Sequence, residues 1–175
     1  MARPRFHALI TAPLAWKVAR DWGPAGVAGT IAGGLLIDAD HLVDYGWTRL
    51  TGERTHYFAP LHSWELTVLL ALAAWWGDRE AAAAQALPDS WAPRLSALSR
   101  RLGPRRLRLL AAALAGLAAG SGAHLAHDII SNRPSHAGTY SLLFRAWRKF
   151  ERDAVGWREH PDFHGWSSKP WYHWF

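Results

Sequence analysis

Most of this 175-residue chain consists of long apolar stretches separated by short clusters of polar residues. The helix former alanine is abundant in these stretches, and no long run alternates β-branched residues as a strand would. The pattern therefore predicts an all-α bundle of about five to six helices. The predicted helices cover residues 6–20, 25–37, 61–77, 109–123 and 140–155.

Prolines and glycines set the expected boundaries of these helices. We expect Pro13 to kink the first helix and residues 21–24 to form a turn before the second. Residues 42–60 are expected to be a loop with one short helical turn. Gly77 and Asp78 are expected to end the third long helix.

Glycines at helical spacing indicate where helices approach one another closely. Gly29 and Gly33 lie four residues apart on the second predicted helix, an arrangement that admits a neighbouring backbone. Gly120 and Gly122 give the late apolar helix similar room. The chain length fits one domain, so we predict a helical domain over residues 1–155 and a Trp- and His-rich tail over 156–175.

Composition adds a membrane hypothesis to this picture. The formal charge is +6 and twelve residues are Trp, a residue enriched at membrane interfaces. Arginines crowd residues 94–108 beside the longest apolar run, as on the cytoplasmic flank of membrane helices. Several helices are thus expected to be membrane-embedded or membrane-apposed, with lipid as a partner. A soluble cytoplasmic bundle is the alternative, and nucleic acid is the less favoured partner because few aromatic residues interleave the arginines.

The residues that carry chemistry lie where apolar stretches end. Asp38, Asp40 and His41 follow a run of non-polar residues, and buried ionised groups of this kind are normally paired or bound to a metal. His124 and Asp128 are four residues apart, so on a helix they share one face. Taken alone, either cluster could be a hydrogen-bonded structural pair.

Two further histidines begin apolar segments, and together with these clusters they predict one metal centre. His62 opens the third predicted helix and His7 lies near the start of the first. The chain has no cysteine, which confines a metal site to nitrogen and oxygen ligands. Such ligands suit zinc, with manganese or iron as alternatives, as one or two ions. The candidate ligands are His7, Asp38, Asp40, His41, His62, His124 and Asp128.

The order of these motifs resembles the bacterial inner-membrane metal-dependent hydrolases. The resemblance covers about residues 5–130 and rests on His7, Asp38-x-Asp40-His41, His62-Ser63 and His124-x-x-x-Asp128. That group is in turn similar to zinc-dependent phospholipase C and the single-strand-specific zinc nucleases. The resemblance implies that Asp128 bridges two ions. The chain departs from the group's pattern at residues 53–56, so the choice between His56 and His62 as ligand stays open, and it lacks a match to the ligands of a third ion.

The resemblance implies a hydrolase of phosphoester bonds in lipid or lipid-linked substrates, placed in the bacterial inner membrane. A metal-bound water would be the nucleophile, with Asp38 or Asp40 as the general base. Arg54 and His56 are expected to bind the phosphate. The alternatives are a non-catalytic helical membrane protein with a structural His/Asp cluster, and a nucleic-acid phosphodiesterase. No protein partner is evident from the sequence.

Overall fold

The computed structural model describes residues 4–52, 58–86, 96–132 and 137–151. Helices dominate these ranges and no strand is formed within them, which confirms the all-α prediction. The tail beyond residue 155, predicted as a separate segment, lies outside the described residues. The elements are α1 (Pro4–Leu35), η1 (Ile37–Asp40), α2 (His41–Thr51), α3 (Trp64–Ala86), α4 (Ala97–Asn132), η3 (Ala137–Tyr140) and α5 (Leu142–Trp147).

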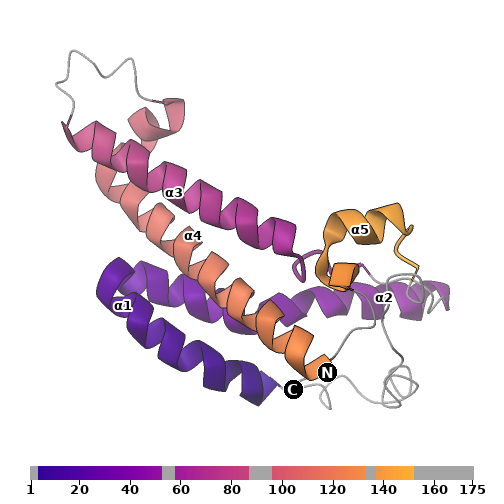
Figure 1. Cartoon of the computed structure of the whole chain (residues 1–175). Coiled ribbons are helices and arrows are strands. Elements are labelled where there is room, and N and C mark those ends of the chain that lie inside the picture. Colours follow the sequence, from indigo (N-terminus) through magenta and orange to yellow (C-terminus); the bar gives the residue numbers. More distant parts are fainter. Residues whose placement is uncertain (1–3, 53–57, 87–95, 133–136, 152–175) are drawn as a thin grey trace.

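Helix α1 is a hairpin of two helical arms. Gly23 has φ 61° and ψ −160°, a conformation that glycine adopts freely, and Pro24 follows it as the first residue of the second arm. The arms pack on each other, because a Cβ atom on Gly34 would lie 2.1 Å from the Thr11 hydroxyl. The predicted turn at residues 21–24 is confirmed. The reversal returns the second arm past the start of the chain (Figure 1).

Helix α4 lies at the centre of the bundle and packs against both α1 and α3 (Figure 1). Its contact with the second arm of α1 brings the two backbones together. A Cβ atom on Gly29 would meet the Ala113 carbonyl at 2.0 Å, and one on Gly120 would meet the Thr30 carbonyl at 2.2 Å. The close helix contact predicted from Gly29 and Gly120 is therefore confirmed.

Two predicted boundaries are wrong. Residues 42–60 were expected to be mainly loop, but helix α2 occupies residues 41–51 and ends at Gly52, whose φ of 75° suits a helix terminus. Gly77 does not end α3. It is buried in the middle of that helix, where a Cβ atom would lie 3.4 Å from the Cβ of Ala111, so it serves close packing against α4 instead.

The last described helix is shorter than its prediction. A helix was expected over residues 140–155, but α5 is only six residues long. Arg145 on this helix is fully buried, because its guanidinium binds backbone carbonyls in the interior, whereas Leu143 and Trp147 are 72% and 73% exposed.

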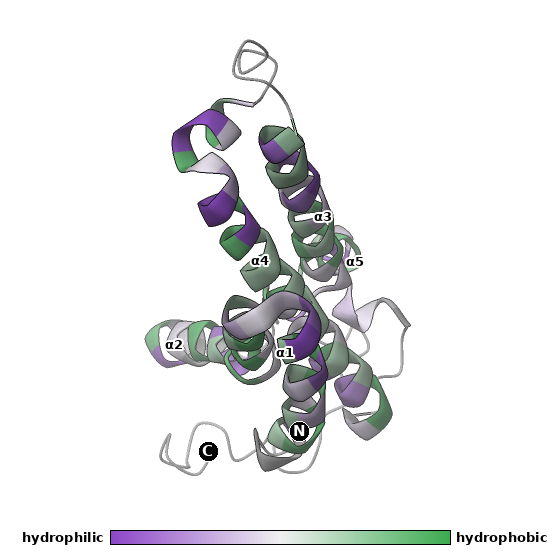
Figure 2. Cartoon of the chain, turned by 90° about the vertical axis from the view of Figure 1, so that its left-hand side faces the viewer, coloured by the Kyte–Doolittle hydropathy of each residue, from purple (hydrophilic) through white to green (hydrophobic). Residues whose placement is uncertain are grey.

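The packing around α4 uses small side chains, while many large apolar side chains face outward. Ala74, Ala81, Ala111 and Ala118 are buried, whereas Leu, Val and Trp residues on α1 to α5 are exposed. Figure 2 shows hydrophilic residues at the N-terminal end of α4 and hydrophobic ones over most of its length.

One described helix, covering residues 97–131, is long and apolar enough to cross a membrane. The bent pair His7–Leu35 and Ile37–Val43 passes the same test if it is taken as one span. Core helices of soluble proteins also pass it, so by itself this finding is weak evidence for a membrane protein.

Candidate metal centre

Four separate segments supply the side chains of the centre. Asp38 and Asp40 lie on η1, directly after the α1 hairpin, and His41 begins α2. His62 lies just before α3. His124 and Asp128 are one turn apart on α4, and His7 comes from the first arm of α1. The predicted ligand residues, 121 positions apart at their extremes, therefore meet in one place.

Four ligand atoms form the middle of this cluster. The His62 Nε2 atom lies 3.1 Å from Asp38 Oδ1, 3.2 Å from His124 Nε2 and 3.7 Å from Asp128 Oδ2. The His124 Nε2 atom lies 3.3 Å from Asp38 Oδ1 and 3.6 Å from Asp128 Oδ2. The two imidazoles and two carboxylates therefore converge on one small volume.

Hydrogen bonds on the far side of each imidazole fix which nitrogen faces this volume. The Nδ1 atom of His124 lies 3.0 Å from the Gly34 carbonyl, which can only accept, so Nδ1 carries the proton there. The Nδ1 atom of His62 lies 2.9 Å from Asp40 Oδ1 and donates to that carboxylate. In the neutral rings both Nε2 atoms therefore direct lone pairs at each other and at Asp38 and Asp128.

This arrangement suits a cation. Two Nε2 lone pairs 3.2 Å apart repel each other, and two protonated rings in the same positions would oppose N–H to N–H. A proton held between the two nitrogens would relieve this repulsion, and a divalent ion would in addition neutralise both carboxylates. The donor set contains nitrogen and oxygen only, which suits zinc and also manganese or iron.

His7 and His41 flank the four central atoms on either side. The His7 Nε2 atom lies 3.6 Å from Asp128 Oδ1, the carboxylate oxygen that faces away from His62. The His41 Nε2 atom lies 3.8 Å from Asp38 Oδ1. Two groups of three ligands result, one of His7, His124 and Asp128 and one of Asp38, His41 and His62, and each could hold an ion.

Asp40 lies behind His62 instead of facing the central atoms. Its Oδ2 atom accepts hydrogen bonds from the backbone N–H of Leu61 at 2.7 Å and of His62 at 3.2 Å, while Oδ1 accepts from the His62 ring. A carboxylate in this position orients a ligating histidine and increases its basicity.

The electrostatics of His62 follow from these neighbours. Burial opposes protonation of the ring, but hydrogen bonds to the carboxylates of Asp38 and Asp40 outweigh it and raise the pKa of His62 from 6.5 to about 9. A cation bound at Nε2 must therefore displace a proton at neutral pH.

Solvent reaches the cluster at one ligand. The side chain of Asp38 is 25% exposed, whereas those of His62, His124 and Asp128 are almost wholly buried. The exposed side chains beside Asp38 in the sequence, Leu36 and Leu42, are apolar.

Some predicted and some unpredicted residues lie outside this set. Arg54 and His56, predicted to bind phosphate, lie outside the described residues, so His62 alone of the two candidate histidines is placed at the centre. Sequence reasoning missed Arg145, whose guanidinium donates to the His62 carbonyl. It also missed Glu65, which contacts the start of α5. Neither residue carries a motif that would have revealed its partner.

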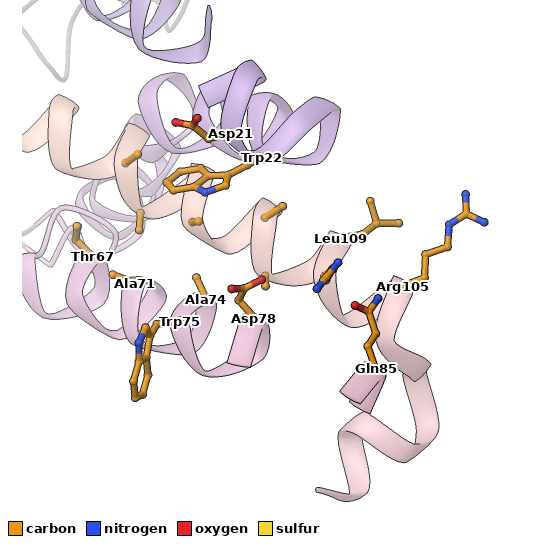
Figure 3. A pocket seen from close by; sticks show the side chains of 16 residues that line it. Asp21, Trp22, Thr67, Ala71, Ala74, Trp75, Asp78, Gln85, Arg105 and Leu109 are labelled. Atoms are coloured by element: carbon orange, nitrogen blue, oxygen red, sulfur yellow. The ribbon is translucent and has the colours of Figure 1, made fainter. Parts of the chain in front are cut away.

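A separate groove of about 820 Å³ runs between α3 and α4 (Figure 3). Alanines such as Ala71, Ala74 and Ala115 line much of it, and charged side chains including Asp78 and Arg105 lie at its edge. None of the predicted metal ligands lines the groove. Thr67, which also lines the groove, donates its hydroxyl to the carbonyl of Ser63, the residue that follows His62.

Comparison with protein-family models, with curated proteins and with solved structures finds no match to this chain.

Proposed function

We propose that the chain is a metal-dependent hydrolase whose centre holds one or two divalent cations, zinc above all, through Asp38, His62, His124 and Asp128, with His7 and His41 as further ligands. The observation that carries the proposal is the spacing of the four ligand atoms. Zn–N and Zn–O bonds of about 2.0–2.1 Å in a tetrahedron require ligand atoms about 3.3–3.4 Å apart. Five of the six separations in this set run from 3.1 to 3.7 Å.

Hydrolysis is the chemistry that such a centre supports best. A bound divalent ion lowers the pKa of water and polarises an ester oxygen. Asp38, the ligand that solvent reaches, is positioned to accept the proton of the attacking water. Asp40 orients His62, so we assign it that role in place of the general-base role considered from the sequence.

Phosphoesters of lipids or lipid-linked molecules are the proposed substrates. Large apolar side chains are exposed on all five α-helices, and extensive exposed apolar surface is typical of interaction or membrane faces. These side chains support a location in or against a membrane. The family resemblance described above implies that this is the bacterial inner membrane. The exposed apolar side chains beside Asp38 in the sequence, Leu36 and Leu42, favour an amphiphilic substrate.

A structural metal staple is the second candidate, and the same geometry gives it a specific basis. Four protein ligands around one ion leave no position for water, as in structural zinc sites. Catalysis is favoured if His7 and His41 also act as ligands. Two ions would then each have three protein ligands and an open position for water.

The metal content of the purified chain and its activity on phosphodiesters test the proposal. We expect about two zinc ions per chain and hydrolysis of both a soluble chromogenic phosphodiester and a long-chain phospholipid. His124→Ala should abolish both metal binding and activity. Ile130→Ala is the control on the same helix, because the Ile130 side chain is 72% exposed.

Each other outcome selects a different conclusion. One ion per chain with no turnover would favour the structural staple. Cleavage of single-stranded nucleic acid in preference to lipid would favour the nuclease alternative. Wild-type protein without bound metal would overturn the proposal.

A further inference from the structure

A buried arginine on helix α5 forms hydrogen bonds to the backbone of the segment that carries His62. The Arg145 side chain is fully buried, and its guanidinium donates four hydrogen bonds to backbone carbonyls. The acceptors are Phe58 at 2.7 Å, Ala59 at 2.9 Å, His62 at 2.9 Å and Ser141 at 3.3 Å. Three of the four belong to the segment that leads to His62.

This segment needs external support to hold its shape. Ala59 has φ 30°, a left-handed conformation that a residue with a Cβ atom rarely adopts. Such backbone persists where surrounding contacts fix it. Arg145 bonds the carbonyls of Phe58 and Ala59 at this point, and the buried side chains of Ile37, Leu125 and Tyr140 pack around Ala59.

Helix α5 is itself held in place from α3. The Glu65 carboxylate accepts hydrogen bonds from the Ser141 hydroxyl and from the backbone N–H groups of Leu142 and Leu143. A carboxylate at the N-terminus of a helix satisfies amides that have no partner within the helix. Glu65 lies three residues after His62. Helix α5 is therefore bound through Glu65 to the same stretch of chain whose carbonyls accept hydrogen bonds from Arg145.

We propose that Arg145 is a positioning residue for the metal centre. It holds the carbonyl side of His62, while Asp40 holds the backbone N–H and the ring Nδ1 of the same residue. His62 is thus fixed from both sides, and its Nε2 atom stays within 3.1–3.7 Å of the other three central ligand atoms. This inference rests on the proposed metal-binding function.

The consequence is measurable as metal affinity. Residues that orient a metal ligand typically contribute about 10–100-fold to the affinity of the site. Arg145→Ala should weaken zinc binding by a factor in this range, and Arg145→Lys should restore only part of it, because one ammonium cannot reach all the carbonyls that the guanidinium bonds. The visible absorption of bound Co²⁺, which reports coordination geometry, should also change.

The experiment titrates zinc against a competing chelator in detergent-purified full-length protein and records the Co²⁺ spectrum of each variant. Arg148→Ala is the matched control, because Arg148 is an exposed arginine three residues away. It should leave affinity and spectrum unchanged. Glu65→Gln removes the charge that holds α5 without touching the buried guanidinium, and it should weaken zinc binding in the same direction. Circular dichroism checks that every variant is folded.

Results that contradict the inference are distinct from those that contradict the metal centre. If wild type binds zinc and both Arg145→Ala and Glu65→Gln bind it within threefold of wild type, the positioning role is wrong while the centre stands. If Arg145→Ala does not fold, Arg145→Lys and Glu65→Gln decide. If wild type binds neither zinc nor Co²⁺, both proposals fall.

Discussion

At the residue scale, the chemistry of the cluster depends on which atom of each side chain is already occupied. The Nδ1 atoms of His62 and His124 are fixed by Asp40 and the Gly34 carbonyl, so only the Nε2 atoms remain for a cation. The sequence predicted the residue types and their grouping. It could not show that Asp40 orients His62, because these two residues are 22 positions apart and only the folded chain brings them together.

The pKa of His62 gives the metal-free protein a defined pH dependence. A pKa raised from 6.5 to about 9 stabilises the folded state fully below pH 6.5, and this stabilisation is lost as pH rises through about 9. Zinc affinity should run the opposite way and tighten by about tenfold per pH unit for each proton displaced. Thermal unfolding with chelator and with zinc, between pH 6 and 8, measures both trends. A zinc affinity independent of pH would argue against His62 as a ligand.

At the element scale, close backbone contacts bring the ligands together. Gly120 lies one turn before His124 and faces the second arm of α1, which leads into Asp38. The contact between α1 and α4 therefore sets the distance between two halves of the centre.

Replacing Gly120 with Ala tests this contact. The added Cβ atom would lie 2.2 Å from the Thr30 carbonyl, so the helices must separate, at a cost of about 1–3 kcal/mol in the free energy of unfolding. Zinc affinity should fall as well. Gly122→Ala is the control, because its Cβ atom would meet Thr67 at 3.6 Å, an ordinary contact. It should be neutral or stabilise the helix by about 0.5–1 kcal/mol. Chemical or thermal unfolding followed by circular dichroism distinguishes the two.

The elements that the sequence predicted well are those set by local pattern. The turn at Gly23 and Pro24 and the apolar helix that runs into His124 follow from the residues alone. The passage of α3 through Gly77 and the burial of Arg145 do not, because each depends on a partner distant in the sequence. Arg145 lies among other basic residues, and nothing in the local pattern separates it from them.

At the scale of the whole molecule, many large apolar side chains are exposed while the clustered histidines and carboxylates are mostly buried. Val68, Leu69, Leu72 and Trp75 form an exposed apolar face on α3, next to the candidate spanning helix α4. An exposed apolar face of this kind is a candidate for contact with lipid.

A charge placed on this face should reveal whether lipid covers it. For a membrane-embedded α3, Leu72→Arg should reduce membrane insertion, at about 2.5–3.5 kcal/mol for a central position. Gln85→Arg, at the exposed end of the same helix, should have little effect. The measurement is the fraction of protein that stays with membranes after an alkaline wash. Wild-type protein recovered in the wash supernatant would favour the soluble bundle.

In the proposed centre, the partial exposure of Asp38 has a kinetic consequence. Within the described ranges, the other three central side chains are almost wholly buried, so a bound ion would exchange past this carboxylate or through opening of the helices. Exchange with free metal should therefore be slow. The supply of metal during synthesis, more than equilibrium preference, would then determine which ion the protein carries.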